Sequence, residues 1–267
     1  MPSQAAQARH DAACRESAST YVDPDTGYQV FTRVGLLARG QCCGAGCRHC
    51  PYHHESVSLE QRPRRIQQPA WLSGAMPQAE TQCALFWSGG KDSFLAYQAL
   101  RRSGHAEIVL ITTFDRASGV IAHQDLSIET IVEQAKHLGA PLLGVPLFSD
   151  SDYVSHIAEG LALVPQATSL AFGDLHLAHI REWREEAFRT DARTAHLELL
   201  FPIWHRPYDS LLQELMAADV SCTLSAVIAL DQGIQVGDVF DREFVNSLPS
   251  GMDAFGENGE FHTVIAF

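Results

Sequence analysis

The sequence predicts an α/β protein in which a doubly wound, mostly parallel sheet follows a small cysteine-rich module. First, strand-like apolar runs alternate with helix-like segments from residue 83 onward, which is typical of a parallel sheet with helices on both faces. Second, a glycine-containing loop joins the first of these runs to the first helix. Third, four of the seven cysteines fall within residues 42–50, ahead of the alternating region.

Composition divides the 267 residues into four parts. Residues 1–20 are polar and alanine-rich and lack the apolar core of a signal peptide, so we expect a disordered tail on a cytoplasmic protein. Residues 21–55 hold the cysteine cluster. Residues 56–80 are rich in Gln, Arg, Pro and Ser without sustained periodicity, which is typical of a linker. Residues 81–267 form the predicted α/β domain.

Strand-like and helix-like segments follow one another along this domain. The predicted strands cover residues 83–87, 108–111, 142–145, 169–172, 199–201 and 223–230. The predicted helices, in which apolar residues recur three or four positions apart, lie near residues 94–100, 128–138, 153–163, 180–187 and 211–215. Ser127 is placed to cap the second helix and Gly139 to end it. Ligands of such folds bind at the carboxyl ends of the strands, where the first loop lies.

The loop after the first strand consists of Ser88, Gly89, Gly90, Lys91, Asp92 and Ser93. Small residues between a strand and a helix leave backbone N–H groups free to bind an anion, and the helix N-terminus adds partial positive charge. Lys91 supplies a full positive charge, and Asp92 can hold a magnesium ion. Lysine is rare in this chain, since Lys136 is the only other one, and its place in the loop favours a specific role. The loop therefore predicts a phosphate site.

The net charge of −13 argues against a general surface for nucleic acid or membranes, without excluding a local basic patch. No apolar run approaches the roughly 20 residues of a membrane-spanning helix. Hydrophobic residues make up 46% of the chain, which is enough to build a large core. The sequence leaves the oligomeric state open.

Three further stretches carry a family resemblance. Residues 172–175 read Phe-Gly-Asp-Leu, with Arg181, Trp183 and Glu185 just beyond; residues 201–204 read Phe-Pro-Ile-Trp; and residues 251–263 read Gly-Met-Asp-Ala-Phe-Gly-Glu-Asn-Gly-Glu-Phe-His-Thr. Together with the Ser-Gly-Gly-Lys-Asp-Ser loop, they resemble the diphthine–ammonia ligase family of PP-loop ATP pyrophosphatases, which have an adenine nucleotide α-hydrolase-like (HUP-like) fold. The resemblance covers residues 83–267.

The resemblance implies an ATP-dependent amide ligase. A carboxylate would be adenylated with release of pyrophosphate, and ammonia would then displace AMP to form an amide. The loop and Mg²⁺ would stabilise charge on the departing pyrophosphate. Superfamily geometry places adenine near residues 112–115, so Thr113, together with Asp174 at the end of the fourth strand, is expected to bind the nucleotide. The expected acceptor is a carboxylate on a small molecule or a protein.

The C-terminal stretch also departs from the family. The diphthamide branch carries an acidic residue where this chain has His262, and a glycine where it has Asn258. If residues 261–267 form a strand, Glu260 and His262 share one face because side chains alternate along a strand. With Glu257, they are expected to bind ammonium or remove its proton, and capping of a turn is the alternative. The departure leaves the acceptor open, and carboxylates of corrinoid metabolism are among the candidates.

The cysteine cluster comprises Cys42, Cys43, Cys47 and Cys50. In a cytosolic chain such clustering indicates metal or redox chemistry more often than structural disulfides. Cys43, Cys47 and Cys50 have the C-x3-C-x2-C spacing of an iron–sulfur cluster with one open iron. A zinc site would instead be completed by Cys42, His49, His53 or His54. The stretch resembles a small, poorly characterised cysteine-motif family, and both a [4Fe–4S] cluster and Zn²⁺ stay open. A reduced structural turn is the alternative to metal binding.

Two enzyme classes compete. The glycine- and glutamate-rich C-terminal stretch favours the amide ligase, whereas the cysteine cluster favours an iron–sulfur-dependent sulfur transferase that adenylates tRNA or a small molecule. The acidic net charge counts against tRNA. A nucleotide-sensing regulator with a zinc module is a third interpretation, and the presence of both Lys91 and Asp92 argues against it.

Overall fold

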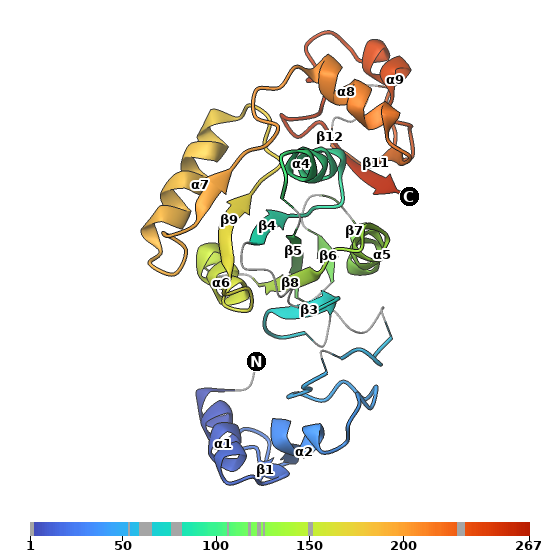
Figure 1. Cartoon of the computed structure of the whole chain (residues 1–267). Coiled ribbons are helices and arrows are strands. Elements are labelled where there is room, and N and C mark those ends of the chain that lie inside the picture. Colours follow the sequence, from blue (N-terminus) through green and yellow to red (C-terminus); the bar gives the residue numbers. More distant parts are fainter. Residues whose placement is uncertain are drawn as a thin grey trace. The chain divides into compact units, whose positions relative to one another are not determined.

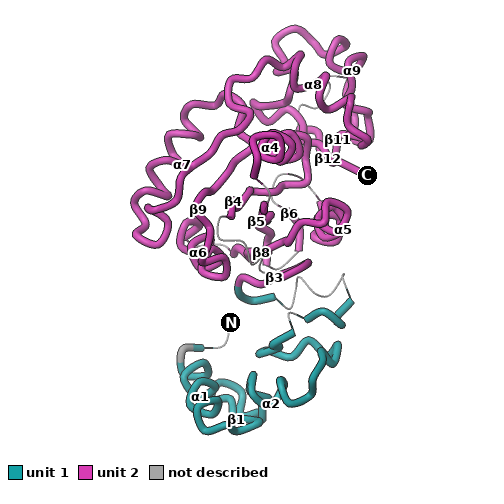
Figure 2. Tube along the Cα trace, in the orientation of Figure 1, with its two compact units in different colours: residues 1–68 teal, residues 69–267 magenta. Residues whose placement is uncertain are grey.

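The computed structural model describes residues 3–52, 54–58, 66–75, 82–105, 107–116, 119–121, 124, 126–148, 152–228 and 233–267. Figure 1 shows the helices and strands of the whole chain. The chain divides into two compact units, Met1–Gln68 and Pro69–Phe267, which Figure 2 colours separately. The boundary between the units lies within residues 56–80, the predicted linker.

The first unit contains helices α1 (Gln4–Arg15) and α2 (Arg33–Leu37) and a hairpin of strands β1 (Thr20–Val22) and β2 (Gln29–Phe31). The structure differs here from the disordered tail that the sequence predicts over residues 1–20. Alanine favours the helical conformation, and Ser3 caps the first turn of α1 by accepting the N–H of Ala6. Ala6 is fully buried, so α1 is held by packing inside the unit.

A six-stranded sheet forms the centre of the second unit, with the strand order β10-β9-β4-β5-β8-β3. Its strands are β3 (Ala70–Ser73), β4 (Gln82–Phe86), β5 (Ile108–Asp115), β8 (Leu142–Leu147), β9 (Ala167–Ala171) and β10 (Glu198–Leu200). All neighbouring strands are parallel except β3, which is antiparallel to β8. Helices α5 (Ile128–Leu138) and α6 (Tyr153–Leu161) lie on opposite faces of the sheet (Figure 1). The predicted doubly wound, mostly parallel α/β fold is therefore confirmed.

Most helices described in the second unit form where the sequence predicts them. Besides α5 and α6, the predicted helices are α4 (Lys91–Arg102), α7 (Ala178–Thr190) and α8 (Tyr208–Ala217), whereas the short α9 (Arg242–Ser247) was not predicted. Ile157 of α6 and Phe188 of α7 pack against Val109 and Leu143 of the sheet in one core. As expected, Ser127 caps α5 by accepting an N–H, and Gly139 ends it in the left-handed conformation. None of the helices within the described residues is long and apolar enough to cross a membrane.

The order of the strands places a crevice beside β4. Strands β5 and β8 are added on one side of β4, and the chain then returns to place β9 and β10 on its other side. At such a switch point, the loops that leave neighbouring strands turn in opposite directions and open a ligand site. The predicted phosphate loop follows β4, and Asp174 follows β9, so both lie at this crevice.

Strand β3 is an element that the sequence analysis missed. It falls within the stretch assigned to the linker, yet Trp71 and Leu72 are buried. The strand pairs with β8 and forms one edge of the sheet. A run of three apolar residues, Ala70 to Leu72, is too short a pattern to indicate a strand. Residues 59–65 and 76–80 of the same stretch lie outside the described residues.

The last predicted strand of the alternating series is not part of the central sheet. Strand β11 (Ser221–Val227) instead pairs antiparallel with β12 (Phe261–Ala266) in a separate two-stranded sheet. Burial alternates along β12, as is typical of an antiparallel strand with one covered face. This strand confirms the one expected near the C-terminus. Residues 229–230 of the predicted strand lie outside the described residues.

Candidate functional site

The predicted phosphate loop connects β4 to α4. Helix α4 begins at Lys91, and its N-cap residue, Gly90, has no side chain to accept the first N–H groups. Gly89 has a φ of +83°, and a Cβ there would lie 2.5 Å from Cδ1 of Ile131. Only glycine fits at this position, because the backbone conformation and the neighbouring side chain both exclude a Cβ. The loop therefore presents the positive end of a helix that lacks its own cap, as an anion site requires.

The C-terminal strand holds this loop in place. The N–H of Ile265, in β12, donates to the carbonyl oxygen of Gly89 at 2.9 Å, and Oγ1 of Thr263 accepts the N–H of Lys91 at 3.1 Å. The Gln134 side chain, on α5, donates to the carbonyl oxygens of Gly89 and Ile265 at 3.0 and 2.7 Å. The sequence analysis missed both side chains. The available signal for Gln134 is a polar residue on the buried face of an otherwise apolar helix.

Replacing Thr263 by valine is expected to destabilise the loop. Valine keeps the shape of the side chain but removes the oxygen that accepts the N–H of Lys91, and Thr263 is only 2% exposed, so water cannot replace it. Loss of a helix cap lowers the free energy of unfolding by about 1 kcal/mol, which urea denaturation measures. Thr168→Val, at an exposed position of β9, is the control. Equal losses in the two variants would contradict the capping role.

The Lys91 ammonium group is buried beside the loop. The Lys91 side chain is 3% exposed, and its Nζ lies 2.9 Å from Oδ2 of Asp92. The rings of Phe255, Phe240 and Phe261 surround the same nitrogen, with centroids 5.3, 5.4 and 5.9 Å away. Oδ1 of Asp92 is buried and has no hydrogen-bond partner in the described part of the chain. Burial raises the pKa of Asp92, and the neighbouring Lys91 opposes that rise.

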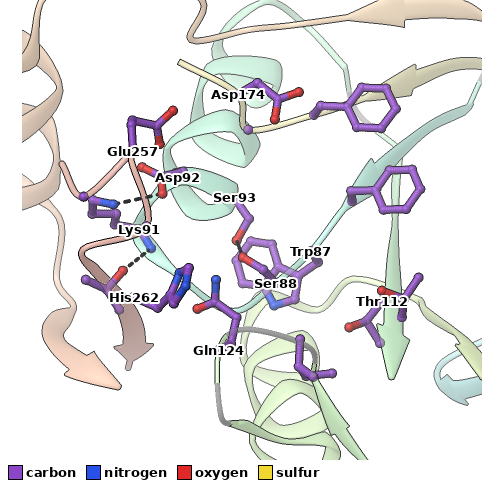
Figure 3. Close-up of a pocket in the computed structure, with 18 of the residues that line it drawn as sticks. Trp87, Ser88, Lys91, Asp92, Ser93, Thr112, Gln124, Asp174, Glu257 and His262 are labelled. Atoms are coloured by element: carbon purple, nitrogen blue, oxygen red, sulfur yellow. Dashed lines mark hydrogen bonds and ion pairs between the residues drawn. The ribbon is translucent and has the colours of Figure 1, made fainter. Parts of the chain in front are cut away.

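A cavity of about 550 Å³ opens beside Lys91 and Asp92, at the end of the sheet where the loop lies (Figure 3). Its volume is in the range of small-molecule sites. The structure brings most of the expected site residues together in its wall, namely Ser88, Lys91, Asp92, Ser93, Thr113, Asp174, Glu257 and His262. Gly89 and Gly90 shape the loop without lining the cavity, and Glu260 does not line it either.

Asp174 follows β9 and is held by a salt bridge. Its carboxylate oxygens accept from Nε and Nη2 of Arg184 at 2.7 and 3.2 Å, and the guanidinium lies 4.4 Å from the centre of the Phe172 ring. A Cβ on Gly173 would lie 2.9 Å from backbone atoms of Asp92, so this glycine allows the end of β9 to approach the start of α4. The carboxylates of Asp92 and Asp174 consequently face one cavity.

Glu257 enters the cavity from the C-terminal loop, and Figure 3 shows it beside Asp92 and Lys91. Burial, and then the nearby Asp92 carboxylate, raise the pKa of Glu257 to about 8, while Lys91 opposes the shift. Asp253 and Asp174 make smaller contributions to the same rise in the pKa of Glu257. A carboxyl group with such a pKa is partly protonated near neutral pH, so it can accept or donate a proton there.

Glu260 and His262 do not share one face of a strand, contrary to the expectation from alternation. Glu260 precedes the first residue of β12 and belongs to the loop. Its carboxylate accepts the N–H groups of Asp253 and Asn258 at 3.0 and 3.1 Å, so it caps a turn, which was the alternative role for this residue. His262 does line the cavity (Figure 3). The expectation failed because side chains alternate between faces only within a strand, and Glu260 lies outside it.

One side of the cavity is apolar and aromatic. Phe86, Phe172 and Tyr153 line it, and the first two rings stack with centroids 4.9 Å apart. Thr112 lies on this side (Figure 3), and its buried hydroxyl has no hydrogen-bond partner among the described residues. Flat apolar walls with one unused polar group suit a planar heterocycle. The sequence analysis missed Tyr153, which carries no motif and comes from a helix that is distant in sequence.

In the first unit, the cysteines form two close pairs. Sγ of Cys43 lies 3.3 Å from Sγ of Cys47, and Sγ of Cys50 lies 3.9 Å from Sγ of Cys42. Within the described residues, no group of three or more Cys, His, Asp or Glu side chains is placed to hold one metal ion. His53, one of the alternative ligands, lies outside the described residues. Metal binding at these cysteines therefore stays a prediction.

The other two histidines of this stretch make different contacts. The His49 ring stacks on His10, with centroids 3.7 Å apart, and its Nε2 lies 3.0 Å from the Tyr21 hydroxyl. Nε2 of His54 lies 3.0 Å from the carbonyl oxygen of Cys47. Neither Nε2 atom is therefore directed at a cysteine sulfur.

Protein purified without oxygen is expected to carry iron or zinc in the first unit, because clustered thiolates bind both metals. Cys43→Ser, Cys47→Ser and Cys50→Ser are each expected to lower the metal content. Elemental analysis, together with the visible spectrum, distinguishes an iron–sulfur cluster from colourless Zn²⁺. Cys14→Ser, outside the cluster, is the control, and metal-free protein from metal-replete cells would refute the prediction.

Comparisons with known proteins match parts of the chain. A family of unknown function (DUF5522) matches residues 9–56, which include the cysteine pairs. Among solved structures, a predicted subunit of tRNA methyltransferase from Methanocaldococcus jannaschii is 21% identical, with a TM-score of 0.32 over 51% of this chain and 74% of that one. The FMN adenylyltransferase of Candida glabrata, in complex with FAD and inorganic pyrophosphate, is 16% identical, with a TM-score of 0.33 over 51% of this chain and 48% of that one. At these scores the likenesses assign no function.

Proposed function

We propose that residues 69–267 form an ATP-dependent ligase, similar to the diphthine–ammonia ligases, that adenylates a carboxylate and joins it to ammonia. The observation that carries the proposal is the buried Lys91–Asp92 pair at the start of α4, in one cavity with Asp174 and Glu257. In the first step, a carboxylate oxygen attacks the α-phosphorus of ATP, and pyrophosphate leaves. In the second step, ammonia attacks the acyl carbon, AMP leaves and one proton is lost.

The two sides of the cavity suit the two ends of ATP. On one side, the N-terminus of α4 and the Lys91 ammonium supply positive charge for the phosphates. On the other side, the half-buried rings of Phe86 and Tyr153 offer apolar surface for adenine, and the Thr112 hydroxyl offers a hydrogen bond. This assignment keeps Thr113, which lines the same cavity, near the nucleotide.

Mg²⁺ is the expected partner of ATP at this site. Asp92 has a buried carboxylate oxygen without a partner among the described residues, and Mg²⁺ prefers such hard oxygen ligands. In nucleotide sites the ion is held by one or two carboxylates together with phosphate oxygens. Asp92, with Asp174 facing the same cavity, meets that requirement. When bound, the ion would neutralise charge on the leaving pyrophosphate.

Glu257 is assigned to the second step. Ammonium must lose a proton before its nitrogen can attack, and a base whose pKa is near the working pH is best suited to take that proton. The Glu257 carboxyl meets this condition because burial and Asp92 raise its pKa to about 8. His262 lines the same side of the cavity and is placed to contact ammonia or the acceptor.

The direct test is an incubation of the full-length protein with ATP, Mg²⁺, candidate carboxylates and ammonium. AMP, pyrophosphate and the mass of the product are measured together. Amide formation that requires both ATP and ammonium is the expected result. Failure to release pyrophosphate with a broad panel of carboxylates would contradict the ligase assignment.

Sulfur transfer is a second candidate, favoured by the paired cysteines of the first unit. In that reaction an adenylated tRNA or small molecule receives sulfur in place of ammonia. The same incubation with sulfide instead of ammonium separates the two, because the product mass identifies the atom transferred. Amide formation by a Cys43→Ser/Cys47→Ser variant at the wild-type rate would exclude a role for this pair in the amidation.

A further inference from the structure

The loop that carries Glu257 is built around Asp253. Oδ1 of Asp253 accepts the N–H groups of Phe255 and Glu257 at 2.8 and 3.2 Å. The Glu260 carboxylate accepts the N–H of Asp253 at 3.0 Å and closes the loop from its other end. These two carboxylates fix the backbone position from which the Glu257 side chain reaches the cavity.

A hydroxyl group on α8 holds Asp253 in turn. The Tyr208 hydroxyl lies 2.9 Å from Oδ2 and 3.1 Å from Oδ1 of Asp253, and 3.0 Å from Nδ1 of His176. Burial, and next the hydrogen bond to Asp253, raise the pKa of Tyr208. The hydroxyl therefore stays protonated and donates a hydrogen bond to the Asp253 carboxylate. We therefore assign Nδ1 of His176 as the donor to the Tyr208 oxygen. The three groups form one directed chain that ends on Asp253.

The Tyr208 ring makes a contact that can be separated from this chain. The ring stacks on Phe255, with centroids 4.4 Å apart, and Phe255 is one of the rings around the Lys91 ammonium. Phenylalanine at position 208 keeps the stacking and removes only the hydroxyl. A single substitution therefore isolates the bond to Asp253.

We propose that Tyr208 is a positioning residue for Glu257, whose carboxyl it holds beside Asp92 and Lys91 by fixing Asp253. The consequence for catalysis rests on the proposed function, in which Glu257 takes the proton of ammonium. When Asp253 loses its hydrogen bond from the Tyr208 hydroxyl, the loop is no longer fixed and the Glu257 side chain can move out of the cavity toward water. The amidation step then slows, while the phosphate side of the cavity is unchanged.

The test compares Tyr208→Phe with the wild-type protein and with a matched control, Tyr52→Phe. Tyr52 also loses a hydroxyl that donates one hydrogen bond, to the carbonyl oxygen of Leu37 at 2.9 Å, but it lies in the first unit. The pKa of the Glu257 carboxyl is measured by NMR on full-length protein labelled with ¹³C-glutamate, and Glu257→Gln assigns the signal. KM and kcat for ammonium, and KM for ATP, are the second measurement.

Among the described residues, the charged and titratable groups that line the cavity with Glu257 or act on it electrostatically are Asp92, Lys91, Asp174, Asp253, Arg184, His262, Tyr153 and Tyr208. In Tyr208→Phe, the pKa of Glu257 is expected to fall by about one unit, because the carboxyl leaves Asp92 and gains water. The kcat for ammonium-dependent turnover falls about tenfold, and KM for ATP stays at the wild-type value. His176→Ala, at a half-buried position, is expected to shift the same pKa in the same direction, and it keeps the test available if Tyr208→Phe does not fold.

Each outcome bears on the proposal. Unchanged Glu257 pKa and ammonium kinetics in folded Tyr208→Phe would overturn it, and so would equal changes in Tyr52→Phe. A lowered Glu257 pKa in Tyr208→Phe, with no amide product from the wild-type protein, would support the positioning role and refute the proposed function. The NMR measurement separates these cases because it requires neither ATP nor an acceptor.

Discussion

Lys91→Met is expected to remove most pyrophosphate release and to leave the fold intact. Methionine keeps an unbranched side chain of similar length among the rings of Phe240, Phe255 and Phe261, so packing is preserved. In the proposed reaction the lost ammonium is the charge that would meet the phosphates, and losing one such contact costs on the order of 2–4 kcal/mol, or roughly 30- to 1,000-fold in rate. Calorimetry with Mg²⁺ and ATP, which needs no acceptor, measures the accompanying loss of affinity.

The second lysine of the chain supplies a matched control for this substitution. Lys136 is half exposed on α5, where its ammonium lies 2.7 Å from the Glu133 carboxylate. Lys136→Met removes the same charge and is expected to leave ATP binding and pyrophosphate release at wild-type levels. Wild-type activity in folded Lys91→Met would contradict the phosphate assignment of the loop.

Glu257→Gln is expected to separate the two half-reactions. ATP binding and adenylation persist, because glutamine fills the same space and Lys91 and Asp92 are unchanged. Ammonium no longer accelerates turnover, since loss of a general base lowers the rate by about 10²- to 10⁴-fold. AMP and amide are measured in the same samples over a range of ammonium concentrations, with Glu133→Gln on α5 as the control. A loss of ATP affinity in proportion to the loss of rate would instead place Glu257 in the nucleotide site.

The raised pKa of Glu257 also predicts how the stability of the unliganded protein depends on pH. The pKa is about 8 in the folded chain against a usual value of 4.5, so the folded state holds this proton more tightly than the unfolded state. The stabilisation is present in full below pH 4.5, and it is lost as the pH rises through 8. Urea denaturation at a series of pH values should show a steeper loss for the wild type than for Glu257→Gln. Identical profiles would contradict the raised pKa.

The strands of the central sheet were predictable because they carry a strong local signal. Both faces of a parallel sheet are covered, so β4, β5 and β8 each contain a short run of apolar residues, and small polar or glycine residues mark where the next helix begins. Where the signal was weak, the prediction failed. Helix α1 was assigned to a disordered tail and β3 to a linker, because few large apolar residues mark either element and the packing that holds each one is not visible in the local sequence.

Strand β11 shows that the sequence can predict a strand without predicting which strand it pairs with. Residues 223–227 were correctly predicted to form a strand, but the partner of this strand is β12 rather than the central sheet. The partner of a strand is chosen by register and by which faces remain uncovered, and neither is encoded within a short apolar run. Glu260 shows that the exact start of a strand matters as well. Strand β12 begins at Phe261, so Glu260 lies in the preceding loop and caps a turn there.

The sequence by itself determined the glycine-containing loop predicted to bind phosphate and the order of elements that places it at the carboxyl end of a sheet. Those features depend on residues that are neighbours in the sequence. They are glycines that allow the backbone conformation of the loop, a lysine and a carboxylate at the start of a helix, and local periodicity. Tertiary structure alone decided what surrounds the loop. Thr263 caps Lys91 from 172 positions away, Gln134 joins Gly89 to β12, and Tyr208 holds the loop of Glu257. These contacts join segments that are far apart in the chain, so they follow from how the elements pack and not from any local pattern.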